Sequence, residues 1–532
     1  MNRYITILFV GFLSILSSCD GDFEDINTDP NRAGGDIFDP NLILPDAIHS
    51  YGTSTTGYNG AVLFESMWVQ IMASTSTGEA NYYSNGDKYV ASAQVNSYAQ
   101  SIWNIDYQTA SKFFQMSKLA REKGMDNLAH IGDILKIMSI AYISDVYGDV
   151  PYSEALQLEN DISRPVYDRQ QDMYPQMLAE LETAILALDD AGFSPTNDIL
   201  YDGDIQQWRK FGYSLMLKMA MRLVNAAPEI AQEYAEKAAT GGVFLSAEDE
   251  AVAPTDDTTG FTNGNGAAFG IVGDLYEVRW SKTLIDYLQA TDDPRIPVIA
   301  EVPEPGLAAN RAIGEVGDSD PSIQIGLPNG YDLRGGATDV SNEPDYPGPT
   351  GTGDDVAPIG NYSRPTAIYR DRSAPVFILT YAEVQLLLAE AAVRGYNVSG
   401  TPSEYYNNAL IGAMQSINKF GGSQVSATAA AAYASANPLD VSSADASLQM
   451  INEQFWATTG LNGNFVEAWS NWRRSDYPEL TPVNYTGNFS SGQIPTRQIY
   501  PTTEVSNNPE NFNAAVSNMG GNTWIVKVWW DQ

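Results

Sequence analysis

Tyrosines grouped with amides and carboxylates are the residues of this sequence that could carry binding chemistry. Residues 78–94, "GEANYYSNGDKYVASAQ", place Tyr82, Tyr83 and Tyr89 among asparagines and Asp87. Aromatic rings stack on the C–H faces of sugar rings, while amide and carboxylate groups hydrogen-bond to the hydroxyl groups. A peptide ligand would instead use backbone hydrogen bonds and apolar pockets. This stretch therefore fits either kind of ligand.

A second group of candidates lies between residues 246 and 375. In "LPNGYDLRGG", Tyr331 is followed by Asp332 and Arg334, which could hydrogen-bond a ligand that stacks on the ring. The further aromatic candidates of this region are Tyr276, Trp280, Tyr346 and Tyr362. For each ring the alternative is packing on the scaffold with the polar group outward. Aromatic residues inside predicted helices are expected in the core, namely Trp103, Phe113, Trp208, Trp469 and Trp472.

Residues for catalysis or metal binding are sparse. One cysteine excludes an intrachain disulfide, and two histidines, His49 and His130, argue against a Cys/His zinc site. The pairs Asp256-Asp257 and Asp354-Asp355 could furnish oxygen ligands for calcium, but neither has the EF-hand spacing. We predict no catalytic residues and no cofactor, with calcium kept as an alternative.

Composition and charge narrow the class of protein. The net charge of −37 and the pI near 4.2 argue against a nucleic-acid binder, which needs a basic face for phosphate. The chain is 43% hydrophobic and contains 10 Trp, 30 Tyr and 18 Phe, which is ample for a large buried core. We therefore expect a folded protein with a solvated acidic surface.

The first residues have the pattern of an export signal. Arg3 precedes the apolar run from Tyr4 to Leu16, which is too short to span a membrane. The sequence Leu-Ser-Ser-Cys that ends at Cys19 resembles the lipobox of bacterial lipoproteins, in which the cysteine becomes the lipidated first residue. Residues 1–18 are predicted to be a signal peptide, and Cys19 the membrane anchor.

Two parts of the chain show helical periodicity. From about residue 60 to 245, and again from about 376 to 475, apolar residues recur at three- and four-residue steps. Thr380 and Glu383 have the spacing of a capping box, and Gly395 is suited to the end of that helix. Consecutive helices with short connections predict packed pairs. Arg473 and Arg474, near the end of the last helix, are expected to form an exposed surface pair, with pairing to acids or contact with a partner as the alternatives.

The region between residues 246 and 375 has a different character. Gly, Pro, Asp, Asn and Thr dominate it, and only "SKTLIDYLQATDDPRI" has a clear helical pattern. Long loops on a rigid scaffold often carry binding residues. We predict one mostly α domain over residues 19–532, in which residues 246–375 form a loop-rich binding region and residues 476–532 a C-terminal segment.

Six stretches in order along the chain resemble one known family. They are "CDGDFEDINTDPN" from Cys19, "YGDVPYSEAL" (147–156), "DPRIP" (293–297), "LTYAEVQLLLAEA" (379–391), "VEAWSNWRRSDYPEL" (466–480) and "IYPTTEVSNNPENFNAAV" (499–516). Together they resemble the SusD/RagB family of nutrient-binding outer-membrane lipoproteins, in particular its SusD-like branch.

The resemblance implies a fold and a function. The family fold is a single domain of tetratricopeptide-like helix pairs, an α/α superhelical scaffold whose long irregular loops form a binding face. Members are not enzymes. They are lipid-anchored at the cell surface in the outer membrane, and they deliver oligosaccharides or oligopeptides to a SusC-like TonB-dependent transporter. Their ligand-binding residues vary, so none is transferred to this chain.

Two other functions remain open from the sequence. The 66 acidic residues could include the carboxylate pair of a glycoside hydrolase built on a helical scaffold. A structural surface protein or adhesin would need no ligand at all. The acidic run after Cys19 is expected to mark export to the outer face of the membrane, with a solvated tether as the alternative.

Overall fold

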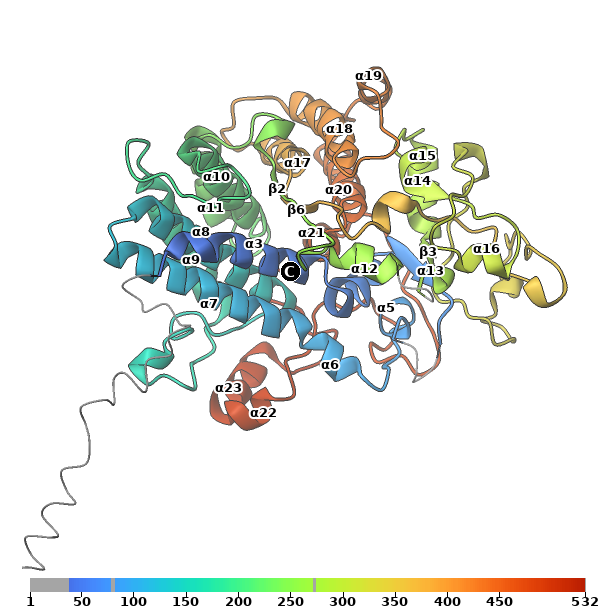
Figure 1. The fold of residues 1–532 in the computed structure, drawn as a ribbon, viewed down its shortest axis with the longest axis horizontal. Helices are drawn as coiled ribbons and strands as arrows, with labels where there is room; N and C mark the ends of the chain where they lie inside the picture. The colour runs from blue at the N-terminus through green and yellow to red at the C-terminus, as the bar shows by residue number, and fades with distance from the viewer. Residues whose placement is uncertain (1–37, 78–81, 271–273, 532) are drawn as a thin grey trace, which may run out of the picture. The chain divides into compact units, whose positions relative to one another are not determined.

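Packed pairs of helices make up most of the protein (Figure 1). The computed structural model describes residues 38–77, 82–270 and 274–531, and the part from Asn41 to Gln532 forms one unit. The predicted signal peptide, Cys19 and the acidic run after it lie outside the described residues.

The helical scaffold confirms the predicted mostly α fold. α7 packs on α8, α10 on α11, α17 on α18 and α20 on α21. The scaffold begins earlier than the predicted residue 60, because α3 precedes that residue in the sequence and packs against α7. The scaffold helices are α3 (Ile43–Thr55), α7 (Ser101–Glu122), α8 (Asp126–Tyr147), α9 (Gln170–Leu186), α10 (Ile205–Met221), α11 (Pro228–Gly241), α17 (Tyr381–Val393), α18 (Pro402–Asn418), α19 (Ala427–Ala436), α20 (Ala444–Leu461) and α21 (Phe465–Ser475).

Local sequence explains where these helices begin and end. The predicted capping box of α17 is present, since the Thr380 hydroxyl accepts from the Glu383 N–H and Glu383 Oε2 accepts from the Thr380 N–H. At the end of α8, Gly148 has a φ of +89°, and a Cβ there would lie 2.3 Å from the Met519 side chain. Only glycine suits both constraints.

The loop-rich region contains short elements that the sequence pattern does not reveal. Its helices are α12 (Gly264–Gly270), α13 (Asp274–Glu277), α14 (Lys282–Ala290), α15 (Ile296–Ile299) and α16 (Leu307–Arg311). Among these only α14 falls in the stretch that has a clear helical pattern. The others have seven residues or fewer, so the 3.6-residue period cannot repeat enough to be read.

The described residues form three small antiparallel sheets, of which two join the loop-rich region to the scaffold and the third joins two parts of the loop-rich region. They pair β1 (Met72–Ser74) with β3 (Val278–Trp280), β2 (Ala251–Ala253) with β6 (Val376–Leu379), and β4 (Ala300–Glu301) with β5 (Arg364–Pro365). The remaining short helices are α4 (Glu65–Trp68), α5 (Ser84–Asp87), α6 (Val95–Ala99), α22 (Glu504–Asn507) and α23 (Pro509–Met519). The β1–β3 pair brings the first tyrosine-rich segment beside the loop-rich region.

The C-terminal segment runs back over the scaffold (Figure 1). Its large aromatic side chains Trp524 and Trp530 are buried. Trp524 stacks on Phe489 at 4.5 Å between ring centroids, and the Trp530 indole N–H donates to Asp145 at 3.0 Å. The Gln498 N–H donates to the carbonyl of Val146 at the end of α8. These contacts make the segment part of the core rather than a tail.

The predicted core aromatics are buried, but the two arginines of α21 correct the sequence prediction. Trp103, Phe113, Trp208 and Trp469 are buried and Trp472 is half-buried. Arg473 and Arg474, expected to be exposed, are buried as well. Arg474 donates to both oxygens of Glu390 at 2.7 Å, and the Arg473 guanidinium lies 3.5 Å from the Trp469 ring centroid. The Arg474 charge is stabilised by Glu390 on α17, and the Arg473 charge by the face of the Trp469 ring.

Replacing Arg474 by alanine is expected to destabilise the fold by about 3–5 kcal/mol, because Glu390 keeps a buried charge with only Arg394 beside it. The matched control is Arg372→Ala, since Arg372 forms an exposed pair with Asp257 and such pairs contribute at most about 1 kcal/mol. Denaturant unfolding followed by circular dichroism measures both. Equal effects of the two changes would contradict the structural role of the Arg474–Glu390 pair.

The buried carboxyl group of Glu65, on α4, differs from that of Glu390, because its surroundings favour the neutral form. Glu65 is fully buried; one of its oxygens accepts from Gln498 Nε2 at 2.6 Å and the other has no hydrogen-bond partner in the structure. Burial raises the pKa of Glu65 to about 7, because desolvation disfavours the charged form. The folded protein therefore holds a proton that the unfolded chain releases above its ordinary pKa.

This raised pKa predicts a pH dependence of stability. Between about pH 4.5 and 7 unfolding releases the Glu65 proton, so the free energy of unfolding falls as the pH rises, by on the order of 3 kcal/mol for this group. Glu65→Gln removes this contribution, and its stability relative to wild type should rise from pH 5 to pH 8. Urea unfolding across this range measures it, with the exposed Glu122→Gln as control. A difference that does not change with pH would refute the assignment.

Candidate ligand-binding face

A cluster of tyrosines lies where the first tyrosine-rich segment meets the scaffold. The ring centroid of Tyr82 lies 5.5 Å from that of Tyr58, 5.2 Å from that of Tyr83 and 6.1 Å from that of Tyr98. Tyr58, Tyr82 and Tyr98 are half-buried, whereas Tyr83 lies beneath them without exposed surface. We call these four residues the tyrosine cluster. Its edge-to-face contacts fix the ring orientations and leave part of three rings at the surface.

The carboxylate of Asp87 joins this segment to the loop-rich region. Asp87 is fully buried at the end of α5. Its Oδ1 accepts from the Ser74 N–H at 3.1 Å and from Asn329 Nδ2 at 2.8 Å, and its Oδ2 accepts from the Gly330 N–H at 2.9 Å and from Lys88 Nζ at 2.7 Å. One charged group thus binds β1, α5 and the loop that carries Tyr331. We call it the Asp87 node.

Asp332 continues this network on the far side of Tyr331. Its carboxylate accepts from the Tyr485 hydroxyl, the Thr338 hydroxyl and the Arg334 N–H. Burial opposes ionisation, but these hydrogen bonds hold the pKa of Asp332 below its ordinary value. The Arg334 guanidinium reaches back to the carbonyl of Thr77 at 2.9 Å. Tyr331 is therefore held between two anchored neighbours, half-buried, beside an exposed arginine.

The structure places the remaining predicted contact residues in different settings. Tyr276 is half-buried, with the Arg311 guanidinium 4.9 Å from its ring centroid. Tyr346 is half-buried and its hydroxyl donates to the carbonyl of Pro358. The Trp280 indole N–H donates to the carbonyl of Ile299 in the core.

Several predicted contacts are corrected by burial. Tyr83, Tyr89, Trp280 and Tyr362 expose at most 1% of their surface, so these rings cannot stack on a ligand and serve as core instead. Asp332 is also buried, and its carboxylate holds the loop rather than facing outward. Ligand contact stays a prediction for the residues with exposed surface, which are Tyr82, Tyr276, Tyr331, Arg334 and Tyr346.

Three members of this face are absent from the sequence prediction. Tyr58 and Tyr98 lie in and beside helical pattern, where aromatics are expected in the core, and Tyr485 lies in the C-terminal segment. Only the fold brings them beside residues 82 and 332. One feature of the sequence could have pointed to this arrangement, because Asp87 lies between Tyr83 and Tyr89 in the segment that it helps to position.

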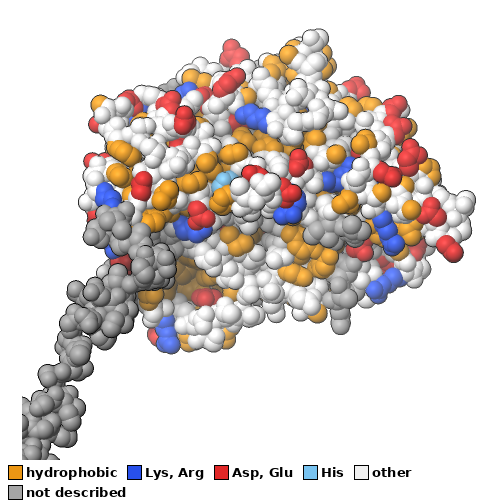
Figure 2. All heavy atoms as spheres, viewed as in Figure 1, with side chains coloured by type: hydrophobic (Ala, Val, Ile, Leu, Met, Phe, Trp, Pro, Cys, Tyr) orange, Lys and Arg blue, Asp and Glu red, His pale blue; other side chains and the backbone are white. Residues whose placement is uncertain are grey.

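The surface view fits a face that combines apolar and polar groups. In Figure 2, hydrophobic side chains gather over the area where Figure 1 shows α5 and α6, and acidic side chains are scattered over the loop-rich side. A groove of about 700 Å³ lies elsewhere, between the Asp293–Pro297 turn and the start of α19, and no aromatic side chain lines it. The tyrosine-bearing face is therefore the better match to stacking chemistry.

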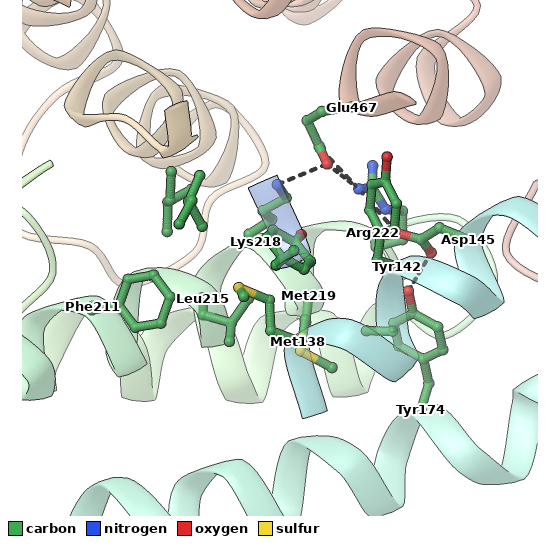
Figure 3. A pocket seen from close by; sticks show the side chains of 14 residues that line it. Met138, Tyr142, Asp145, Tyr174, Phe211, Leu215, Lys218, Met219, Arg222 and Glu467 are labelled. Carbon is green, nitrogen blue, oxygen red and sulfur yellow. Dashed lines mark hydrogen bonds and ion pairs between the residues drawn. The ribbon is translucent and has the colours of Figure 1, made fainter. Parts of the chain in front are cut away.

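A buried cluster of charges between α8, α10 and α21 could be mistaken for a catalytic site (Figure 3). Arg222 Nη2 lies 2.8 Å from Glu467 Oε1 and 3.3 Å from Asp145 Oδ2, and Lys218 Nζ lies 2.8 Å from Glu467 Oε2. Although burial opposes it, Arg222 and Lys218 lower the pKa of Glu467 to about 2. The cavity beside them measures about 30 Å³, room for about one water molecule. A sugar ring cannot enter, so this carboxylate pair is structural.

Neither metal clusters nor membrane-spanning helices are found in the described part of the chain. Among residues 38–77, 82–270 and 274–531, no group of three His, Cys, Asp or Glu side chains is arranged to hold a metal ion. Within the same residues, no helix has the length and apolarity needed to cross a bilayer. The predicted calcium alternative stays without a cluster to support it there.

Replacing Asp87 by asparagine is expected to loosen the Tyr331 loop, because Lys88 then keeps an unpaired buried charge and one donor loses its acceptor. Since a hydrogen bond to a charged group contributes about 1.5–3 kcal/mol, the Gly330 amide should exchange at least about tenfold faster. Hydrogen exchange with mass spectrometry measures this. The control is Asp286→Asn, which breaks only the exposed pair with Lys282. Unchanged exchange over residues 327–334 would contradict the role of the node.

Comparison with known proteins identifies the fold. The family model described as "Starch-binding associating with outer membrane" matches residues 41–501. Among solved structures, a chitin-binding protein is 28% identical, with a TM-score of 0.77 over 93% of this chain and all of that chain. A SusD-like protein of the Bacteroidetes is 22% identical, with a TM-score of 0.78 over the same shares.

A third solved structure is a chitin-binding SusD homologue from Flavobacterium johnsoniae. It is 21% identical, with a TM-score of 0.71 over 92% of this chain and 98% of that chain. A search of the curated proteins gives no significant match. The resemblance read from six short stretches is thus confirmed by a match over most of the sequence. The chain belongs to the SusD-like family of starch-binding, outer-membrane-associated proteins.

Proposed function

We propose that this protein captures oligosaccharides at the bacterial cell surface and delivers them to a SusC-like TonB-dependent transporter in the outer membrane. The tyrosine cluster carries the proposal, because it leaves parts of three rings at the surface, and the Asp87 node ties the same segment to the loop that carries Tyr331 and the exposed Arg334. Rings and polar groups in this arrangement match the alternating C–H faces and hydroxyl edges of a sugar chain.

Preorganisation of the face favours binding. The Asp87 node and the Asp332 network use buried charged hydrogen bonds to hold Tyr331 before any ligand arrives. A face that is already ordered loses little conformational entropy on binding. The same rigidity would suit a protein that must accept a ligand and release it to a partner.

The ligand class is supported by one relative. The chitin-binding protein is 28% identical over nearly the whole chain, which makes oligomers of N-acetylglucosamine the first probe to use. An oligopeptide is the alternative, because aromatic loops with polar neighbours suit peptides as well. Family membership speaks for binding rather than catalysis, and we propose no enzymatic activity.

Anchoring completes the proposal. Cys19 would carry the lipid after removal of residues 1–18, and the acidic run behind it would direct the protein to the outer face of the outer membrane. The lack of a membrane-spanning helix among the described residues is compatible with such an anchor. No cofactor or nucleic acid has a part in this function.

Isothermal titration calorimetry of the mature protein against chitohexaose, maltohexaose and a hexapeptide library tests the proposal. We expect binding of at least one hexasaccharide, weakened at least about tenfold by Tyr82→Ala, which corresponds to about 1.4 kcal/mol. The control is Tyr405→Ala, a half-buried tyrosine on α18 whose hydroxyl accepts from the Gly400 N–H.

Each alternative has its own outcome in this experiment. Binding of peptides alone would replace the ligand class. If mass spectrometry detects shortened sugars in the calorimeter cell after the titration, the result would favour the glycoside hydrolase. Absence of any binding, together with failure to co-purify with a transporter from outer membranes, would leave the structural adhesin.

A further inference from the structure

Two exposed arginines of the loop-rich region lack the acidic partners that their neighbours have. In this region Lys282 lies 2.9 Å from Asp286, and Arg372 lies 3.1 Å from Asp257. Arg311 and Arg334 are exposed, and no described carboxylate lies within 4.0 Å of either guanidinium.

Both arginines flank the same short stretch of chain, the continuation of β1 past Ser74. On one side, Arg334 donates to the carbonyl of Thr77 at 2.9 Å. On the other side, the Thr75 N–H donates to the carbonyl of Glu277, the neighbour of the Tyr276 ring on which Arg311 lies. The two guanidinium groups therefore lie on the two sides of this stretch, Arg311 on the Tyr276 ring and Arg334 near Tyr331 in the sequence.

A third arginine beneath Arg311 adds positive charge. Arg279 is fully buried and donates to the carbonyls of Leu275 and Val278 and to Asn310 Oδ1, without a carboxylate partner among the described residues. Its Nε has no hydrogen-bond partner in the structure. Burial, with a smaller effect from Arg364, lowers the pKa of Arg279 to about 9, so that it still carries its charge at neutral pH.

The described acids of these segments keep their negative charge, but their oxygens are hydrogen-bonded to other groups. The Asp332 carboxylate accepts from Tyr485, Thr338 and the Arg334 N–H, and Glu277 accepts from the Ser76 hydroxyl. The net charge of the whole protein acts weakly here, because salt screens exposed charges beyond about 10 Å at 0.1 M. The two exposed guanidinium groups are thus left without a carboxylate partner among the described residues.

We propose that Arg311 and Arg334 form an anion subsite, so that the preferred ligand is an acidic oligosaccharide whose carboxylate or sulfate groups pair with these guanidinium groups. The planar fork of arginine suits both anions, because it donates two parallel hydrogen bonds. The tyrosines would stack on the sugar rings, while the arginines would pair with the carboxylate or sulfate groups of these sugars. This inference rests on the proposed function and narrows its substrate class.

Two probes compared at low and at high salt test the charge. Chitohexaose has six N-acetylglucosamine units, whereas a hyaluronan hexasaccharide has three of these units, three glucuronates and different linkages, so the salt dependence of the preference reports the charge. We expect the hyaluronan hexasaccharide to bind at least about tenfold more tightly at 20 mM salt, and this preference to shrink at 500 mM salt. A chondroitin sulfate hexasaccharide in the same titrations tells whether sulfate adds to carboxylate.

The variants assign the preference to its residues. Arg311→Ala and Arg334→Ala should each lower the ratio of hyaluronan to chitohexaose affinity at least about fivefold, and Arg334→Lys should restore part of the ratio. Arg372→Ala, an exposed arginine of the same region that is paired with Asp257, should leave the ratio unchanged.

The outcomes separate this inference from the proposed function. Binding of chitohexaose with equal or weaker binding of both acidic probes would overturn the anion subsite and leave the proposed function standing. If a hexaglutamate peptide binds and none of the three sugars does, both the anion subsite for sugars and the proposed function are overturned. An acidic preference that persists in Arg311→Ala and Arg334→Ala would place the anion elsewhere and refute the assignment.

Discussion

The ligand-binding face depends on one buried carboxylate. Asp87, the last residue of α5, accepts four hydrogen bonds from donors on β1, on the loop before Tyr331 and on the following residue, Lys88, whose buried charge it balances. A buried charge is tolerated only when such partners surround it, so the three segments must stay together for any of them to be stable. These hydrogen bonds fix the backbone of the three segments, and they therefore also hold the exposed rings in place.

The scaffold uses the same device at a larger scale. Glu390 with Arg474, and Glu467 with Arg222 and the partly buried Lys218, form ion pairs that join helices distant in the sequence. The helix pairs provide the apolar surface, and these charges fix which pairs adjoin. An acidic protein thus places many of its few basic residues inside, where they determine structure. The exposed arginines beside Tyr276 and Tyr331 have no carboxylate partner among the described residues and lie next to partly exposed rings, which is why we propose that they meet a ligand.

Much of the fold could be predicted from the sequence, but less of the site. Helices such as α8 and α17 are long, periodic and capped, so their positions follow from spacing and from Thr380 and Glu383. Tyr82 and Tyr331 could be selected because they lie in polar loops, yet Tyr83 and Tyr89, in the same stretch, are buried. Burial of a loop residue depends on distant chain, here the segment around Phe489 that hydrogen-bonds to Tyr89. Neither Tyr58 nor Arg474 carries a local signal of its setting.

The central claim is that sugars bind over the tyrosine cluster and the Tyr331 loop. A crystal structure of the mature protein with a bound hexasaccharide tests it most directly. We expect sugar rings stacked on Tyr82 or Tyr331, with all four hydrogen bonds of Asp87 intact. A hexasaccharide bound instead in the groove between the Asp293–Pro297 turn and α19, with no sugar at the tyrosine cluster, would show that the ligand binds at another site.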